Sequence, residues 1–154
     1  MVDAGAMKGI ILSLLAGFER DGYTHVILLS GHYPNGRQYL QPAMEAYRQS
    51  GGAMQALAIV ETEIPGVSGD HAAKYETSSL LYLEPEIVDM GAMEGMPPGQ
   101  RGGPEERINW MEDAYQNHPC YGLYGIDPRE HASAAIGMEN TRRLVNFLKA
   151  WLKG

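Results

Sequence analysis

The stretch Val26-Ile27-Leu28-Leu29-Ser30-Gly31-His32-Tyr33-Pro34-Asn35 decides the fold. Its first four residues form a continuous apolar run, which is typical of a strand buried in a parallel sheet. Ser30 and Gly31 end the run, and His32 follows where the strand gives way to the next helix. In an α/β domain this edge of the sheet is where sites are built. Two interpretations of His32 stay open: a metal ligand or general base, or a loop histidine that hydrogen-bonds a backbone carbonyl.

The residues on either side of this stretch predict an α/β arrangement. An amphipathic helix is indicated before it by apolar residues at helical spacing, and Gly22 is suited to end that helix. A second helix is predicted over residues 36–48, with Pro42 marking a first turn or a kink. Residues 54–60 read as a second buried strand, so right-handed crossovers and a parallel sheet covered by helices are expected. The apolar positions of the first helix are Met7, Ile10, Ile11, Leu14, Leu15 and Phe18.

The second half of the chain has weaker sequence signals for secondary structure. Asp70 is a good N-cap for a helix over residues 71–83, and residues 86–90 are compatible with a short strand. The Gly-, Pro- and Met-rich loop 91–104 is too long for a simple connector and suggests a lid or an interface arm. Residues 105–115 are ambiguous between helix and coil, and a last helix is predicted over residues 129–152. The whole chain, 1–154, is expected to form a single domain.

Composition excludes several classes of protein. The net charge is −7 and the isoelectric point about 5.1, and without a basic cluster a nucleic-acid partner is excluded. Cys120 is the single cysteine, so no intrachain disulfide is possible. No apolar run approaches the length of a membrane span and no signal peptide is evident, which predicts a cytoplasmic protein. The sequence has no nucleophile elbow, H-E-x-x-H motif or P-loop.

A second block carries candidate chemistry about forty residues after the first. His71 lies at the predicted start of a helix, a position that suits a neutral base or ligand, although a histidine without chemistry fits equally well. Glu76 follows on the same helix beside small hydroxyl residues, where a partly buried carboxylate needs a metal or a cationic partner. A solvent-facing glutamate is the alternative. Two histidines and a glutamate at such positions favour a metal-assisted hydrolytic site.

Three blocks, in order, resemble the creatininase family (creatinine amidohydrolase and its relatives). The family's N-G-H-x-x-N block is similar to residues 30–35, and its H-A-G-x-x-E-T-S block is similar to residues 71–78. A Gly-rich run that opens the final helix of the family is similar to residues 122–128, followed by Ala132 and Gly137. Three blocks in register are much more specific than one.

The resemblance implies a three-layer α/β/α fold with a mostly parallel sheet, often assembled into hexamers. It also implies hydrolysis of an amide, cyclic amide or related ester or lactone bond, with one or two divalent ions of zinc, manganese or iron. By resemblance His32 is a metal ligand, His71 transfers the proton, and Glu76 binds a metal or orients the catalytic water. Tyr33, Asn35 and Asp70 would then line the substrate pocket.

The sequence also departs from the family pattern. The resemblance covers about the C-terminal three-fifths of a family member. The family's metal-binding E-x-H segment and the Asp that follows it have no counterpart before His32, so we expect a fold lacking the N-terminal strands. Pro34 stands where creatininase itself has a metal-binding Glu, and Ala73 replaces the usual Gly of the second block.

Two functions from different classes are therefore predicted. The first is a metal-dependent hydrolase of a small amide or lactam. It either keeps a reduced site of His32, His71 and Glu76 with one metal, or gains ligands from another copy of the chain or from a separate N-terminal subunit. The alternative is a non-catalytic, truncated paralogue that acts as a binding or assembly subunit. A homo-oligomer is expected in either case, because a sheet without its N-terminal strands exposes an edge that must be covered.

Overall fold

The computed structural model describes residues 3–93, 107–112, 116–117 and 120–154. The chain divides into two compact units, Met1–Pro65 with Asn146–Gly154 and, between them in sequence, Gly66–Val145. Most of the predicted loop 91–104, and part of segment 105–115, lie outside the described residues. No helix among the described residues is both long and apolar enough to cross a membrane.

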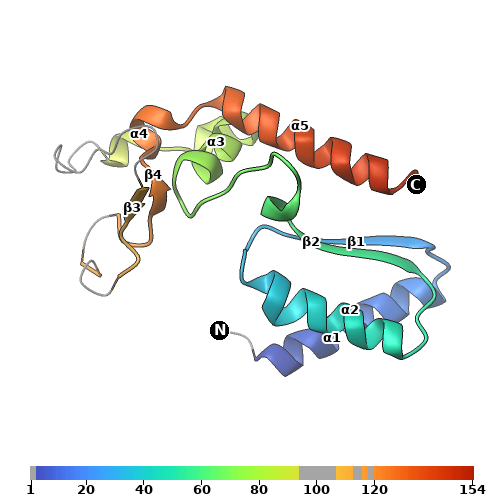
Figure 1. Ribbon diagram of the computed structural model, residues 1–154. Coiled ribbons are helices and arrows are strands. Elements are labelled where there is room, and N and C mark those ends of the chain that lie inside the picture. Colours follow the sequence, from blue (N-terminus) through green and yellow to red (C-terminus); the bar gives the residue numbers. More distant parts are fainter. Residues whose placement is uncertain (1–2, 94–106, 113–115, 118–119) are drawn as a thin grey trace. The chain divides into compact units, whose positions relative to one another are not determined.

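The first unit is built on a parallel pair of strands. Strand β1 (His25–Ser30) pairs with β2 (Gln55–Val60) in a register that runs from His25 opposite Gln55 to Ser30 opposite Val60. Helices α1 (Ala4–Arg20) and α2 (Gln41–Gln49) lie together on one side of this pair (Figure 1). The predicted helices, strands and parallel pairing of this part of the chain, and with them the α/β class, are confirmed.

Local sequence explains where these elements begin and end. Asp3 caps α1 by accepting a hydrogen bond from the Ala6 N–H, and Gly22 follows the helix with φ 87°, as expected of a left-handed terminator. Residues Gly36–Leu40 form a π-helical turn, and Pro42 then lies in the first turn of α2. Pro42 therefore lies at the junction of the π-helical turn and α2, where the hydrogen-bond pattern changes. The predicted irregularity at Pro42 is confirmed.

The core of the first unit lies between α1, α2 and the sheet. Tyr47 ties these elements together: its hydroxyl donates to Glu19 Oε2 at 2.7 Å and accepts from the Met54 N–H at 3.2 Å. Glu19 Oε1 accepts from the Ala53 N–H at 2.8 Å, and the Tyr47 hydrogen bond is the main cause of a lowered Glu19 pKa. The buried core residues are Ile11, Leu15, Tyr39, Leu40, Ala43, Met44, Tyr47, Met54 and Val60.

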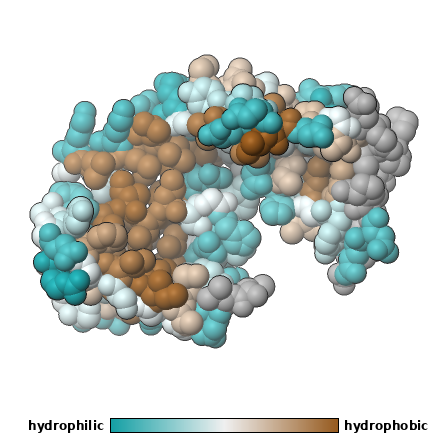
Figure 2. Space-filling model, turned by 180° about the vertical axis from the view of Figure 1, so that it is seen from behind, coloured by the Kyte–Doolittle hydropathy of each residue, from teal (hydrophilic) through white to brown (hydrophobic). Residues whose placement is uncertain are grey.

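Strand β1 differs from the prediction in its burial. The sequence predicts a strand buried on both faces, but five of its six residues are half-buried and Leu29 is exposed. Among the described residues β1 has β2 as its one strand neighbour, so its other edge lacks strand pairing. Exposed apolar side chains also include Ile10 and Leu14 of α1, and apolar surface gathers on this unit in Figure 2.

The second unit contains α3 (Lys74–Leu83), an antiparallel pair and the start of the last helix. Strands β3 (Arg107–Asn109) and β4 (Tyr124–Ile126) pair antiparallel. The strand predicted over residues 86–90 is wrong, because 3₁₀ turns Pro85–Ile87 and Met90–Met93 occupy this segment. Pro85 explains the change, since it lacks the N–H that a strand ladder would use.

The predicted continuous last helix is divided into α4 (Pro128–His131) and α5 (Ala134–Trp151). The break lies at Ser133, whose N–H donates to Ser78 Oγ of α3 at 3.0 Å. Gly137 of α5 lies against α3 so closely that an added Cβ would lie 2.0 Å from the Ser78 carbonyl oxygen. Packing of α5 on α3 therefore depends on a small residue at Gly137.

Candidate functional site

The His32 loop of the first unit is closed by Ser30. The Ser30 hydroxyl accepts hydrogen bonds from the His32 N–H at 3.1 Å and from Asn35 Nδ2 at 2.8 Å. The Asn35 N–H donates to the His32 carbonyl at 3.1 Å, so the loop is a tight turn directly after β1. His32 itself is exposed. The turn therefore presents an accessible imidazole on a backbone held by neighbouring hydrogen bonds.

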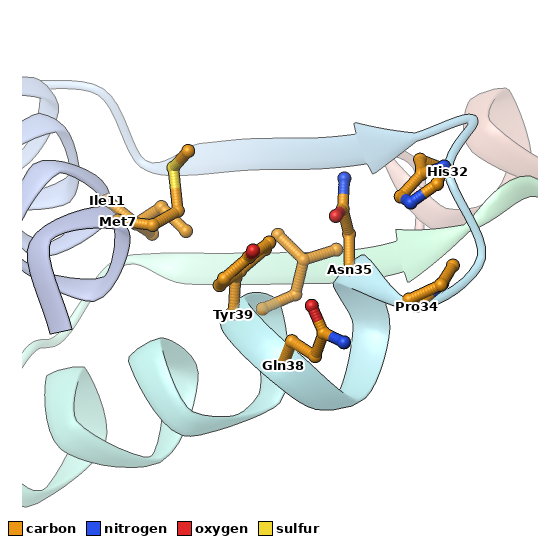
Figure 3. Close-up of a pocket in the computed structure, with 8 residues that line it drawn as sticks. Met7, Ile11, His32, Pro34, Asn35, Gln38 and Tyr39 are labelled. Carbon is orange, nitrogen blue, oxygen red and sulfur yellow. The ribbon is translucent and has the colours of Figure 1, made fainter. Parts of the chain in front are cut away.

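A cavity of about 380 Å³ lies beside this loop within the first unit (Figure 3). Its volume falls within the range of small-molecule pockets. The lining residues with polar groups are His32, Asn35, Gln38 and Tyr39, and the others are Met7, Ile11, Pro34 and Leu40. Tyr33 is not among these residues and packs against the core of the unit. Of the residues predicted in this loop, His32 and Asn35 line the cavity.

The His71 segment of the second unit differs from its prediction. Helix α3 begins at Lys74, with Ala73 as the residue before it, so His71 precedes the helix instead of lying in its first turn. His71 forms a backbone bridge with Tyr124 of β4, and both hydrogen bonds are 2.8 Å long. The half-buried His71 is thus attached to the strand.

Asp70 caps α3 from outside the helix. Its Oδ2 accepts from the Tyr75 N–H at 2.9 Å, and its Oδ1 accepts from the Glu76 N–H at 3.1 Å. The predicted capping function is therefore correct although the predicted helix start is not. Asp70 is 3% exposed, and burial raises the pKa of its carboxyl. A carboxylate so placed is engaged with the backbone, which weakens its assignment to a substrate pocket.

Glu76 is likewise engaged with the backbone. Its Oε2 accepts from the Ala72 N–H at 2.7 Å. Ala72 has φ 50°, which makes it the one non-glycine residue with positive φ among those the structure describes. Asp70, His71 and Glu76 are thus linked through one short segment, a relation that their spacing in sequence does not reveal.

The Gly-rich run before the last helix contains a buried ion pair. Asp127 caps α4 by accepting from the Arg129 N–H at 2.9 Å. The Arg129 side chain also contacts Asp127, with Nη2 2.6 Å from Oδ2, and the two side chains are 7% and 1% exposed. Sequence reasoning missed this pair, although an Asp-Pro-Arg sequence at a helix start was a signal that could have found it.

The grouping of possible ligand side chains decides whether this chain alone can hold a metal ion. Within residues 3–93, 107–112, 116–117 and 120–154, no three or more His, Cys, Asp or Glu side chains are grouped to hold an ion. Glu61 is the acidic neighbour of the His32 loop: its Oε2 is 3.9 Å from the position of a Cβ built on Gly31. The described residues therefore do not fit a complete catalytic metal site, which needs three protein ligands.

Comparison with known proteins places these observations in a family. The family model described as creatinine amidohydrolase matches residues 1–152. The chain belongs to the creatininase family. The comparison with curated proteins found no match.

Solved creatininases share the fold of this chain. A mutant creatininase of the Zn–Zn type and a manganese creatininase are each 19% identical to it, with TM-scores of 0.69 and 0.68. A mutant creatininase complexed with creatine is 20% identical, with a TM-score of 0.69. Each match covers 99% of this chain and 64–65% of the creatininase, so this chain spans under two thirds of their length. The predicted family and creatininase-like fold are confirmed.

Proposed function

We propose that this creatininase-family hydrolase cleaves an amide, lactam or related ester or lactone bond in a small molecule and depends on a divalent metal ion. The observation that carries the proposal is the His32 turn, an exposed imidazole directly after β1 at the border of a cavity of about 380 Å³. Family membership supports the reaction class, and solved relatives in zinc and manganese forms support the kind of metal.

His32 is proposed as a metal ligand, and His71 as the residue that transfers the proton. Neutral imidazole serves both purposes near neutral pH. Because the described residues do not supply three ligands, the proposal takes further ligands from a second copy of the chain or from a separate N-terminal polypeptide.

The same proposal includes self-association. β1 contains no charged residue that would discourage pairing, and the same unit exposes the apolar residues Ile10, Leu14 and Leu29. Sedimentation velocity is expected to show a dimer or a larger assembly. A clean monomer at high protein concentration would contradict this part of the proposal.

Metal content per chain tests the central claim. The protein is purified without an affinity tag or chelator, and its metal content is measured by elemental mass spectrometry. We expect it to carry zinc, manganese or iron. The variant His32→Ala should lose the metal and remain folded. A matched control is His25→Ala, at the opposite end of β1, where the imidazole contacts Thr24 and the Trp151 ring.

Equal metal content in His32→Ala and in the unchanged protein would refute the role of His32. No metal in any sample, even after reconstitution with zinc or manganese, would refute metal dependence and favour the alternative, a binding or assembly subunit. If metal is found, a screen of cyclic amides and lactones should show turnover that His71→Ala abolishes.

A further inference from the structure

A second cavity of the first unit lies where the segments entering β1 and β2 meet, at the opposite end of β1 from His32. Its volume is about 290 Å³, close to the lower limit of small-molecule pockets. His25 and Ser30 lie five positions apart, so this cavity is roughly 17 Å along the strand from the His32 turn. It is therefore distinct from the cavity beside His32. Its lining residues include Glu19, Tyr23, Thr24, His25 and Gln55.

Glu19 brings to this cavity a carboxylate whose charge no ion pair offsets. Its two oxygens accept from neutral donors, the Tyr47 hydroxyl at 2.7 Å and the Ala53 N–H at 2.8 Å. These bonds, the Tyr47 bond most, lower the pKa of the carboxyl, so Glu19 is ionised at neutral pH. Among the residues that the structure describes, no lysine, arginine or histidine forms an ion pair with Glu19, and the adjacent Arg20 contacts Asp21.

The same carboxylate keeps hydrogen-bonding capacity. An ionised carboxylate has about four lone-pair sites, and the bonds from Tyr47 and Ala53 occupy one site on each oxygen of Glu19. A further site on each oxygen matches the two parallel N–H groups of a guanidinium. Glu19 therefore offers both a negative charge and acceptor sites to a ligand in the cavity.

Tyr23 provides an aromatic surface in the same cavity. Its ring packs edge-on against Phe18, with centroids 5.5 Å apart, and the residue is still 59% exposed. An aromatic ring attracts a cation placed over its face, and a planar guanidinium can also stack on it. The other aromatic lining residue, His25, has its Nδ1 3.0 Å from Thr24 Oγ1 and is thus engaged with its neighbour. A carboxylate and an exposed aromatic ring in one cavity favour an organic cation as ligand.

We propose that this cavity binds a small organic cation of the guanidinium or ammonium class, with Glu19 as its anionic partner and the Tyr23 ring as its aromatic wall. An arginine side chain of a second copy carries the same group, and the small volume of the cavity favours the free cation. The inference does not depend on the proposed hydrolase, because this cavity and the His32 turn lie at opposite ends of β1.

A titration of the unchanged protein with methylguanidinium chloride tests the proposal. The ¹H–¹⁵N NMR signal of Ala53 is the reporter, because the Ala53 N–H donates to Glu19. At constant ionic strength this signal should shift and saturate, with a dissociation constant on the order of 1 mM. N-Methylurea has nearly the same planar shape without the charge, and it should shift the signal much less.

Two pairs of variants separate the charge from the ring. Glu19→Gln keeps the size of the side chain and an acceptor oxygen but removes the charge, so the affinity for methylguanidinium should fall about 10-fold or more. Glu45→Gln, which neutralises an exposed carboxylate on α2, is the matched control and should leave the affinity unchanged. Tyr23→Leu should weaken binding about 2–5-fold, whereas Tyr23→Phe keeps the ring and should change the affinity little.

Three results would overturn the proposal. The first is a response to methylguanidinium that does not saturate or that N-methylurea equals. The second is unchanged affinity in folded Glu19→Gln. The third is an Ala53 signal that moves on dilution without any added cation, because it would identify a second copy as the occupant. If Glu19→Gln does not fold, the comparison with N-methylurea and the two Tyr23 variants decide the question.

Discussion

The glycine at position 125 offers a quantitative test of the packing beneath His71. Gly125 is the central residue of β4 and has φ 152°, a conformation that L side chains rarely adopt. A Cβ added there would lie 2.6 Å from both the Ala73 Cβ and the Asp70 Cβ, whereas ordinary van der Waals contact begins at 3.4 Å. Two neighbours would each have to move by roughly 0.8 Å.

The expected cost of Gly125→Ala has two parts. Forcing alanine into this backbone conformation costs roughly 1–3 kcal/mol, and overpacking costs roughly 1–3 kcal/mol more. Gly122→Ala is the matched control, because Gly122 has φ 100° but no heavy atom within 4 Å of an added Cβ. Gly122→Ala should thus show only the first part, and the difference between the variants should be about 1–3 kcal/mol.

Urea unfolding, monitored by tryptophan fluorescence, measures this difference in the free energy of unfolding of the second unit. The chain has two tryptophans, and Trp110 is buried in the second unit. In a Trp151→Phe background the remaining signal therefore reports the unit that contains Gly125. Adding Ala73→Gly to Gly125→Ala removes one of the two close contacts and should recover part of the loss. Equal unfolding free energies for Gly125→Ala and Gly122→Ala would refute the reasoning.

Two further predictions concern stability outside this segment. Tyr47→Phe removes the hydroxyl that serves both Glu19 and the Met54 N–H, so the unfolding free energy should fall by about 1 kcal/mol; the exposed Tyr82→Phe should change it little, and equal effects of the two would contradict the assignment. Hydrogen bonds from Arg142 and then Arg143 lower the pKa of Glu139 from 4.5 to about 2. Because the folded-state pKa is depressed, this stabilisation is present above pH 4.5 and is lost as pH falls through about 2. The melting temperature of Glu139→Gln should therefore lie below that of the unchanged protein at pH 6 and converge with it near pH 2, by a small amount because these side chains are exposed; a gap that is the same at both pH values would contradict the ion-pair explanation.

The first unit could be predicted from the sequence because its signals are local. The apolar positions of α1 recur at helical spacing, β1 and β2 are short continuous apolar runs, and each element ends at a residue suited to end it. Even Pro42 indicated an irregular start to α2 from its covalent chemistry alone. Burial of β1 was predicted less well, because it depends on which neighbours the strand has and not on its own residues.

The second unit could not be predicted to the same extent because distant contacts determine it. Strands β3 and β4 have three residues each, too short for an alternating pattern to be recognised. Helix α3 begins at Lys74 and not at the predicted residue 71, because the carboxylate of Asp70, four residues earlier, caps it from outside. The break before α5 at Ser133 had a local signal, since serine is a favoured capping residue, but its bond to Ser78 joins residues far apart in sequence.

The two carboxylates of the second block show why a family motif does not by itself assign chemistry. Asp and Glu in such a motif suggest catalysis or metal binding, yet here Asp70 accepts two helix N–H groups and Glu76 accepts the N–H of Ala72. These bonds place His71 between a strand and a helix, just as Ser30 places His32 at the end of β1. In both units the histidine is thus carried by a backbone that neighbouring polar side chains hold in place. The proposed chemistry at His32 and His71 therefore depends on the backbone segments that carry these histidines, and those segments are held by the neighbouring hydrogen bonds.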